Sequence, residues 1–441
     1  MKRTQTTILA AVVTMALAAA VLIAVSLNSR GEPASTPITL AYWTHEDPNR
    51  TPFELRLVRE FEAAHPGVRI IRVTYPSTQV AESLFAAFAA NQGPQIFHTQ
   101  LEDSYAFVAN GLVAPVSLEA LGAASTRQIL ERYVPGSLDP VFIDDTLYGI
   151  PLELLNWSIY INDRIFRDAG LDPDRDYPRT WEDMVWLSER IVRRDDGGII
   201  TRRGFDFRYS DYLNAMVPMV EQLGGALISE DGSTAIVGEE AWIAFLHFMQ
   251  QWGPHGKNLG SPAYRNARSL FNHDNDEVAM IHSGMYQQAR IMADNPEFYH
   301  SGEWRVVPFP VFENARRDVA SSYYAQYLMV NADATSRQQY YAWKFISYMQ
   351  QHAEEYLRIR IIQPSRALME SESFLNMPYT DVFMADMDRG NVVYHAANST
   401  RLQELIRDAV EAVMLDNVSP ERAYATLKAH AQEILNSGGG S

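Results

Sequence analysis

Aromatic and polar side chains recur together where the sequence predicts the end of a strand or the start of a helix. An aromatic ring can stack on an apolar ligand face, while carboxylate, amide and hydroxyl groups can bind hydroxyl groups at the ligand's rim. The candidate ligand-binding residues are Trp43, His45, Glu46, Gln100, Glu102, Asp103, Asn156, Trp157, Asp211, Tyr212, Gly284, Met285, Tyr286, Ser322, Tyr323, Tyr324 and Arg366. The same stretches also contain Thr44, Glu153, Ser283, Ser321 and Gln363. These residue types favour non-covalent binding of a hydroxylated molecule.

Several of these candidates also have a structural interpretation. The aromatic residues that could instead belong to the core are Trp43, Trp157, Tyr323 and Tyr324. Asp103 and Asp211 could simply cap helices, and His45 could be a solvated loop residue. Both interpretations stay open at the level of the sequence.

Signals for catalysis are thin. The sequence contains no H-E-x-x-H, G-x-S-x-G, Walker A or G-x-G-x-x-G motif. The 54 acidic residues could always supply a carboxylate pair, so an exported glycoside hydrolase or lyase stays open as an alternative. We predict a binding protein without catalytic residues or a cofactor.

Metal and thiol chemistry are also unsupported. The stretch HDNDE at residues 273–277 resembles a metal cluster but lacks the glycine and distal glutamate of a calcium loop, which favours a solvated turn. Cysteine is absent, so thiolate catalysis, disulfides and Cys-ligated metals are excluded. No metal site is therefore predicted.

Size and charge limit the class of protein further. A chain of 441 residues exceeds what one hydrophobic core usually serves, so two lobes are expected. The formal net charge of −17 repels phosphate backbones and anionic lipid, which argues against nucleic-acid binding.

The elements that must position the candidates alternate in type. Residues 38–43 (ITLAYW), 68–75 (VRIIRVTY) and 95–99 (QIFHT) are expected strands, and residues 51–64 and 81–90 are expected helices. This rhythm predicts βαβ units and a largely parallel sheet. A long extended stretch at residues 147–163 suits a crossover between two lobes.

The two chain ends differ from the body. Residues 1–36 carry a short basic start, an apolar run at residues 8–27 and a linker, and predict a signal peptide or an uncleaved membrane anchor. The run is long enough to span a bilayer, and no A-x-A site closes it, so an anchor is favoured. Residues 436–441 (NSGGGS) predict a flexible tail.

Four stretches in order carry a resemblance to a known family. They are residues 38–70 with F-E-x-x-H-P-G-V, residues 88–116, residues 147–184 with Y-G-I-P, Y-x-N-D-x-x-F-x-x-A-G-L and T-W-E-D, and residues 278–349 with VAMIHSGMY and WRVVPFPVF. Together they resemble the family 1 extracellular solute-binding proteins of ABC importers, the maltose-binding-protein type.

The resemblance implies an α/β, two-lobed periplasmic-binding-protein fold of type II, with each lobe a mostly parallel sheet flanked by helices. It implies lobe 1 at residues 37–149 and 305–362 and lobe 2 at residues 150–304 and 363–435. It further implies a monomeric receptor outside the cytoplasm, in the periplasm or on the outer face of the membrane. Such a receptor binds a sugar or oligosaccharide between its lobes, closes at a hinge and delivers the ligand to the permease subunits. A polyamine, a peptide or ferric iron are the alternative ligands.

Overall fold

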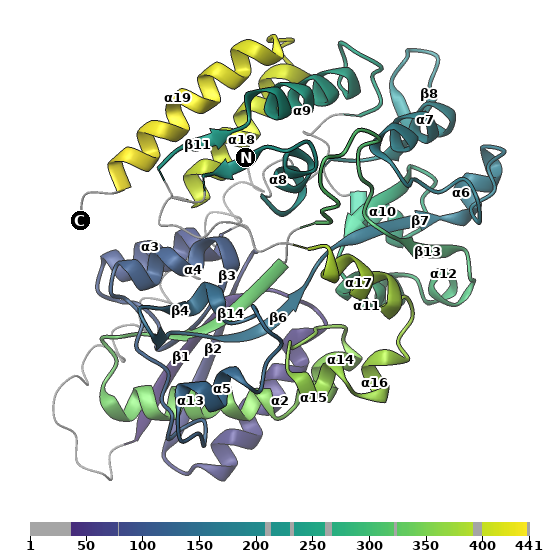
Figure 1. Ribbon diagram of the computed structural model, residues 1–441. Coiled ribbons are helices and arrows are strands. Elements are labelled where there is room, and N and C mark those ends of the chain that lie inside the picture. Colours follow the sequence, from purple (N-terminus) through teal and green to yellow (C-terminus); the bar gives the residue numbers. More distant parts are fainter. Residues whose placement is uncertain are drawn as a thin grey trace, which may run out of the picture.

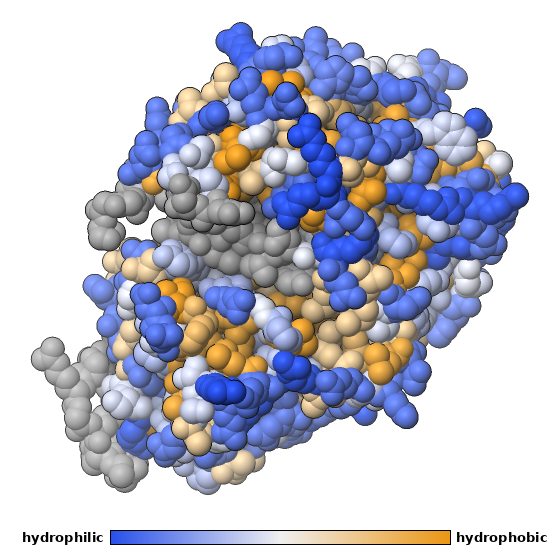
Figure 2. All heavy atoms as spheres, viewed as in Figure 1, coloured by the Kyte–Doolittle hydropathy of each residue, from blue (hydrophilic) through white to orange (hydrophobic). Residues whose placement is uncertain are grey.

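A computed structural model describes residues 37–77, 79–207, 213–229, 233–260, 267–321, 324–390 and 399–438. Figure 1 shows two α/β lobes, each built around a five-stranded sheet. The predicted two-lobed α/β fold is confirmed, but the two sheets are mixed rather than mostly parallel, because each contains both parallel and antiparallel strand pairs. In the view of Figure 2, hydrophilic residues cover most of the outer surface, as the charged composition requires.

The sheet of the first lobe has the strand order β2-β1-β3-β14-β6. Its strands are β1 (Ile38–His45), β2 (Val68–Tyr75), β3 (Ile96–Gln100), β6 (Ile150–Leu155) and β14 (Tyr324–Val330). Strands β1, β2 and β3 are parallel, as the βαβ rhythm predicted, and β14 runs antiparallel to both β3 and β6. The strand predicted at residues 38–43 continues for two more residues, which matters for the site below.

Helices cover both faces of this sheet, with α2 and α13 on one side and α3 and α4 on the other (Figure 1). The elements of this lobe outside the sheet are α2 (Arg50–Ala64), α3 (Val80–Ala89), α4 (Leu101–Ala109), α5 (Thr126–Leu130), η1 (Asp139–Val141), β4 (Phe142–Ile143), β5 (Thr146–Leu147), α13 (Ser336–Gln350), α14 (Ala353–Arg358) and α15 (Arg366–Met369). Apolar residues at helical spacing in α2, Leu57 and Phe61, are buried against the core, where Phe61 meets Phe345 edge-on at 5.2 Å.

The sheet of the second lobe has the order β13-β7-β12-β9-β8. Its strands are β7 (Ser158–Asn162), β8 (Arg193–Arg194), β9 (Ile200–Phe205), β12 (Val278–Ser283) and β13 (Trp304–Val307). The other elements of the lobe are α6 (Asp163–Asp168), α7 (Trp181–Ile191), α8 (Leu213–Gln222), β10 (Ala226–Ile228), β11 (Ala235–Val237), α9 (Glu239–Trp252), α10 (Ala267–Asn272), α11 (Tyr286–Asp294), α12 (Pro296–His300), α17 (Thr380–Asp388), α18 (Ser399–Met414) and α19 (Pro420–Gly438), with α16 (Glu372–Leu375) between α15 and α17.

The crossover between the lobes is short. Strand β6 ends at Leu155 and β7 begins at Ser158, so Asn156 and Trp157 connect the sheets. The Trp157 backbone N–H donates to the Ser321 hydroxyl at 2.9 Å, and that hydroxyl donates to the Trp157 carbonyl at 2.7 Å. Two segments that cross between the lobes thus lie side by side and are hydrogen-bonded to each other.

The expected lobe boundaries need correction. Strand β6 was assigned to lobe 2 by a boundary at residue 150, but it pairs with β14 in the first sheet. Strand β13 spans the boundary expected at residue 305, yet it pairs with β7 in the second sheet. After residue 363 the chain still contacts lobe 1, since the Val134 N–H donates to the Pro364 carbonyl at 2.9 Å. Strand pairing decides the first two points and a backbone hydrogen bond the third, and neither leaves a signal in the hydropathy pattern.

The chain ends are only partly covered by the structure. Helix α19 continues to Gly438, so the tail predicted from residue 436 begins as helix. The predicted signal or anchor at residues 1–36 lies outside the described residues. Within the described ranges, no helix combines the length and apolar character needed to cross a bilayer.

Candidate functional site: a cavity between the lobes

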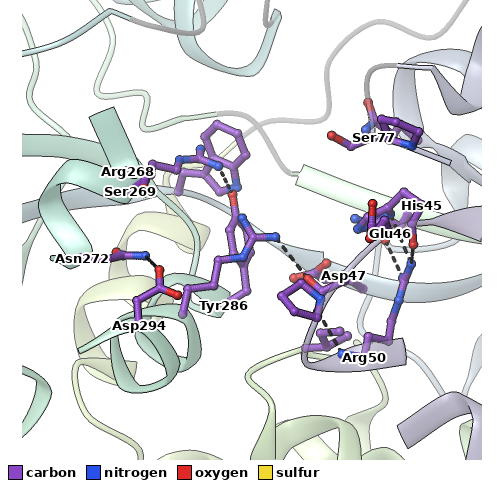
Figure 3. A pocket seen from close by; sticks show the side chains of 18 residues that line it. His45, Glu46, Asp47, Arg50, Ser77, Arg268, Ser269, Asn272, Tyr286 and Asp294 are labelled. Carbon is purple, nitrogen blue, oxygen red and sulfur yellow. Dashed lines mark hydrogen bonds and ion pairs between the residues drawn. The ribbon is translucent and has the colours of Figure 1, made fainter. Parts of the chain in front are cut away.

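A cavity of about 540 Å³ lies between the two lobes. Its described lining residues are His45, Glu46, Asp47, Pro48, Arg50, Pro76, Ser77, Gln100, Glu153, Trp157, Arg268, Ser269, Asn272, Tyr286, Arg290, Asp294, Gln326 and Ile361. In Figure 3, His45, Asp47 and Arg50 face Arg268 and Tyr286 across the open space. Cavities of this size between two lobes are typical of small-molecule sites.

Three neighbouring strands of lobe 1 present a polar row to the cavity. Gln326 of β14 lies directly opposite Gln100 of β3 on one side and Glu153 of β6 on the other. Cross-strand partners point to the same face of a sheet at a spacing of about 4.8 Å. Amide and carboxyl groups therefore stand in line on this wall.

A buried ionic cluster lies beneath the cavity. The Arg50 guanidinium is 3.5 Å from the Glu54 carboxylate, which also pairs with Arg72 at 2.8 Å and accepts the Tyr356 hydroxyl at 3.0 Å. The side chains of Arg50 and Glu54 are 1% and 0% exposed. Buried charges are tolerated only when paired and hydrogen-bonded, so this cluster is a fixed part of the lobe.

Arg50 connects this cluster to the cavity wall. It donates to the Thr44 hydroxyl at 2.6 Å, to the His45 carbonyl at 3.0 Å and to Gln326 at 3.3 Å. One guanidinium thus holds the end of β1, the middle of β14 and the first turn of α2 together. Arg50 therefore connects three of the elements that form this wall.

An ion pair joins the lobes across the cavity. Arg290 of α11 donates to the Asp47 carboxylate at 3.1 Å (Figure 3). The other oxygen of Asp47 accepts the backbone N–H groups of Asn49 and Arg50 at 2.9 Å and so caps α2. Burial opposes ionisation of Asp47, but Arg290 and the Arg50 N–H outweigh it and lower its pKa. Asp47 is therefore an ionised carboxylate that accepts hydrogen bonds from groups of both lobes.

Lobe 2 contributes an arginine supported by aromatic rings. The Arg268 guanidinium lies 4.5 Å over the centre of the Trp157 ring and donates to the Tyr286 hydroxyl at 2.6 Å. Gly284 packs closely against Trp157 and Tyr286, because a Cβ atom at this position would be 2.9 Å from Trp157 and 2.8 Å from Tyr286. Cation–π stacking holds such a guanidinium in place.

Burial sets the charge of two further lining groups. Burial, with the nearby Arg50 guanidinium, lowers the pKa of the His45 imidazole well below its usual range, so His45 is neutral at physiological pH. Burial raises the pKa of the Glu153 carboxyl to about 8, although Arg50 works in the opposite direction. The wall thus carries a neutral imidazole and a carboxyl group that keeps its proton at neutral pH.

The structure brings five of the candidates chosen from the sequence to this cavity. They are His45, Glu46, Gln100, Trp157 and Tyr286. Each follows or ends a strand, as expected for ligands bound at strand ends. Glu153, which the sequence placed in the same crossover stretch, lines the cavity as well.

Six other candidates lie away from the described lining. Trp43 lies inside β1, is 6% exposed and packs on Tyr75 at 4.9 Å, because β1 runs on to His45. Asp103 is buried as the third residue of α4, and Arg366 is exposed at the start of α15. The remaining candidates of this group, buried beside the cavity, are Asn156, Gly284 and Met285.

The side chains of the last six candidates lie outside the described part of the structure. Asp211, Tyr212, Ser322 and Tyr323 lie outside the described residues. For Tyr324 and Glu102 only the backbone is described, in β14 and α4. Their assignment as ligand contacts stays a prediction.

Several lining residues were missed by the sequence analysis, and helical spacing could have found some of them. Arg290 and Asp294 follow Tyr286 at intervals of four along α11 and share its face. Arg268 and Asn272 are related in the same way in α10. Gln326 could not be found in this way, since its place depends on the pairing of β14.

The acidic stretch at residues 273–277 takes part in ion pairs. Asp274 pairs with Arg164 at 2.7 Å, and Asp276 pairs with Arg164 and Arg202. In the described part of the chain, no group of three or more His, Cys, Asp or Glu residues could hold a metal ion.

Two α/β lobes that enclose a polar cavity define the class of periplasmic-type binding proteins. The sequence pattern of the bacterial extracellular solute-binding proteins matches residues 47–356, and the chain belongs to this family. Among curated relatives, an uncharacterised lipoprotein of the oleD 5′ region in Streptomyces antibioticus is 23% identical over 68% of this chain and 64% of its own length. An uncharacterised ABC transporter extracellular-binding protein of Pyrococcus horikoshii is 25% identical over 32% of this chain and 31% of its own. The chain spans less than two thirds of either relative.

Solved structures share the fold at low identity. A solute-binding protein of Thermotoga lettingae bound with α-D-tagatose matches 90% of this chain and 99% of its own, with a TM-score of 0.77 and 18% identity. The GacH receptor of Streptomyces glaucescens, solved unliganded and with acarbose, matches 90% and 98%, with a TM-score of 0.76 and 18% identity. UgpB of Mycobacterium tuberculosis in complex with glycerophosphocholine matches 92% and 99%, with a TM-score of 0.75 and 17% identity.

We expect a large loss of stability when the carboxylate of Glu54 is removed from the buried cluster. Replacing Glu54 by Gln leaves Arg50 and Arg72 without their carboxylate and should lower the free energy of unfolding of lobe 1 by about 3–5 kcal/mol. Glu60→Gln is the matched control, because Glu60 pairs with Arg56 at the exposed surface. Urea denaturation followed by tryptophan fluorescence measures both. Equal midpoints for the two variants would contradict a central role for the cluster.

Proposed function

We propose that the chain is the extracytoplasmic receptor of an ABC importer and binds a sugar or oligosaccharide between its lobes. The observation that carries the proposal is the interlobe cavity of about 540 Å³, lined by amide, carboxyl, guanidinium and aromatic groups from both lobes. Sugars present many hydroxyl groups in a fixed arrangement, and such a lining can hydrogen-bond them from two sides.

The balance of charge in the cavity also supports an uncharged ligand. Among the described lining residues, three arginines (Arg50, Arg268 and Arg290) match three acidic residues (Glu46, Asp47 and Asp294), with Glu153 in addition. Tyr286 is the one tyrosine in this described set, which gives no support to ferric binding by paired tyrosines.

The remaining parts of the proposal concern the partners. The receptor is monomeric, releases its ligand to the transmembrane permease subunits and is held at the outer face of the membrane by its N-terminal segment. Binding without turnover distinguishes it from a glycoside hydrolase.

A ligand screen tests the proposed function. Tagatose, maltose, maltotriose and mannotriose are compared with spermidine, a tripeptide and ferric citrate by thermal shift, with titration calorimetry for each ligand that shifts the melting temperature. A sugar should bind one-to-one, and at 100 times its Kd it should add about 2.7 kcal/mol of stability. Stabilisation by spermidine or ferric citrate alone, or cleavage of an oligosaccharide, would contradict the proposal.

Replacing Trp157 should mainly change ligand affinity, whereas replacing Trp43 should mainly change stability. Trp157→Ala removes the platform beneath Arg268 in the cavity and should weaken binding of the sugar found in the screen by roughly 1–3 kcal/mol, about five- to 150-fold. Trp43→Ala opens a hole between β1 and Tyr75, so it should lower the melting temperature while the folded protein keeps its affinity. Melting curves and titrations of both variants measure this. A larger affinity loss in Trp43→Ala than in Trp157→Ala would overturn the assignment.

A further inference from the structure

Glu153 occupies an unusual place in the cavity wall. It belongs to β6, lines the cavity, is 5% exposed and lies on the same face of the sheet as its cross-strand partner Gln326. Within the described residues, no hydrogen bond or ion pair involves this carboxyl group. A buried polar group in this state lacks a partner that a ligand could supply.

The neighbouring charges are already paired with other groups. Arg50 pairs with Glu54 and donates to Thr44 and His45, and Arg290 is paired with Asp47. The charged groups that act on Glu153 are these two arginines, which favour its ionised form, and Asp47, which opposes it. Gln326, opposite Glu153 in the sheet, is uncharged. Burial is the largest effect and raises the pKa of the carboxyl group to about 8.

We infer that Glu153 meets the ligand as a neutral carboxylic acid and donates a hydrogen bond to a hydroxyl or ring oxygen. This inference rests on the proposed function and makes it more specific, because it selects uncharged polyhydroxylated ligands against cationic ones. An amine or ammonium group would need the carboxylate form. A neutral sugar leaves the proton on Glu153 and completes the polar row of Gln100, Gln326 and Glu153.

The inference fixes how affinity depends on pH. If Glu153 must be protonated in the complex, affinity is highest at pH values at which the free protein already carries this proton. Above the pKa of the free carboxyl group, the proton must be taken up from solution on binding. Affinity should therefore be level from pH 6 to pH 7.5 and fall by up to about tenfold per pH unit above pH 8.

The first experiment needs no ligand. Carbon-13 NMR of protein labelled at the glutamate carboxyl carbons follows the resonance that is missing from Glu153→Gln. A titration midpoint more than two pH units above that of an ordinary exposed glutamate is expected. A midpoint between pH 4 and 5 would overturn the inference and leave the proposed function intact.

The second experiment uses maltotriose, or the sugar from the screen that binds more tightly, titrated at pH 6.5, 7.5, 8.5 and 9.5. Glu153→Gln keeps an N–H donor but has no proton to lose, so its affinity should change by a modest factor and become independent of pH. Glu370→Gln, at an exposed site outside the cavity, is the matched control and should show the pH dependence of the original protein. The same loss of affinity above pH 8 in Glu153→Gln, or tighter binding of spermidine than of any sugar, would overturn the inference. Failure of every sugar to bind would instead contradict the proposed function, while the NMR titration still decides the state of Glu153.

Discussion

Arg50 and Glu54 carry opposite charges in a place that water hardly reaches, and each is stable there only because of what surrounds it. Glu54 forms an ion pair with Arg72 and accepts a hydrogen bond from Tyr356. Arg50 donates its other N–H groups to the end of β1 and to Gln326. The geometry of the cavity wall depends on the hydrogen bonds that these buried charges require. The first turn of α2 lies over the end of β1, and its N-terminus is where Asp47 can meet the opposite lobe.

Asp47 provides one of the contacts between the lobes. Asp47 accepts hydrogen bonds from the α2 backbone and from Arg290, so the same carboxylate binds the start of a helix in lobe 1 and a side chain of lobe 2. At the crossover between the lobes, Ser321 forms hydrogen bonds with the Trp157 backbone and so joins the two crossing segments. Trp157 itself then projects its ring beneath Arg268. Trp157 of the crossover and both members of the interlobe ion pair, Asp47 and Arg290, line the same cavity. This arrangement would suit a protein that closes around its ligand.

The sequence predicted much of the fold because strands and helices leave local patterns. The parallel strands β1, β2 and β3 and the family were recognisable from spacing and motif. Strand-end residues such as Gln100 and Tyr286 were found for the same reason. Gln326 and the lobe assignment of β6 were not, because antiparallel pairing between residues as far apart in the sequence as Glu153 and Gln326 leaves no local signal. Trp43 was expected to end the first strand, but β1 continues to His45 and Trp43 packs against Tyr75 inside the lobe.

The central claim is that two lobes close on one ligand held in the cavity between them. Small-angle X-ray scattering of the protein, alone and saturated with the sugar identified by calorimetry, measures it directly. The radius of gyration should fall on binding, and Arg290→Ala should reduce the fall by removing the interlobe ion pair. An unchanged radius of gyration under saturating ligand would contradict closure, even if the sugar binds tightly.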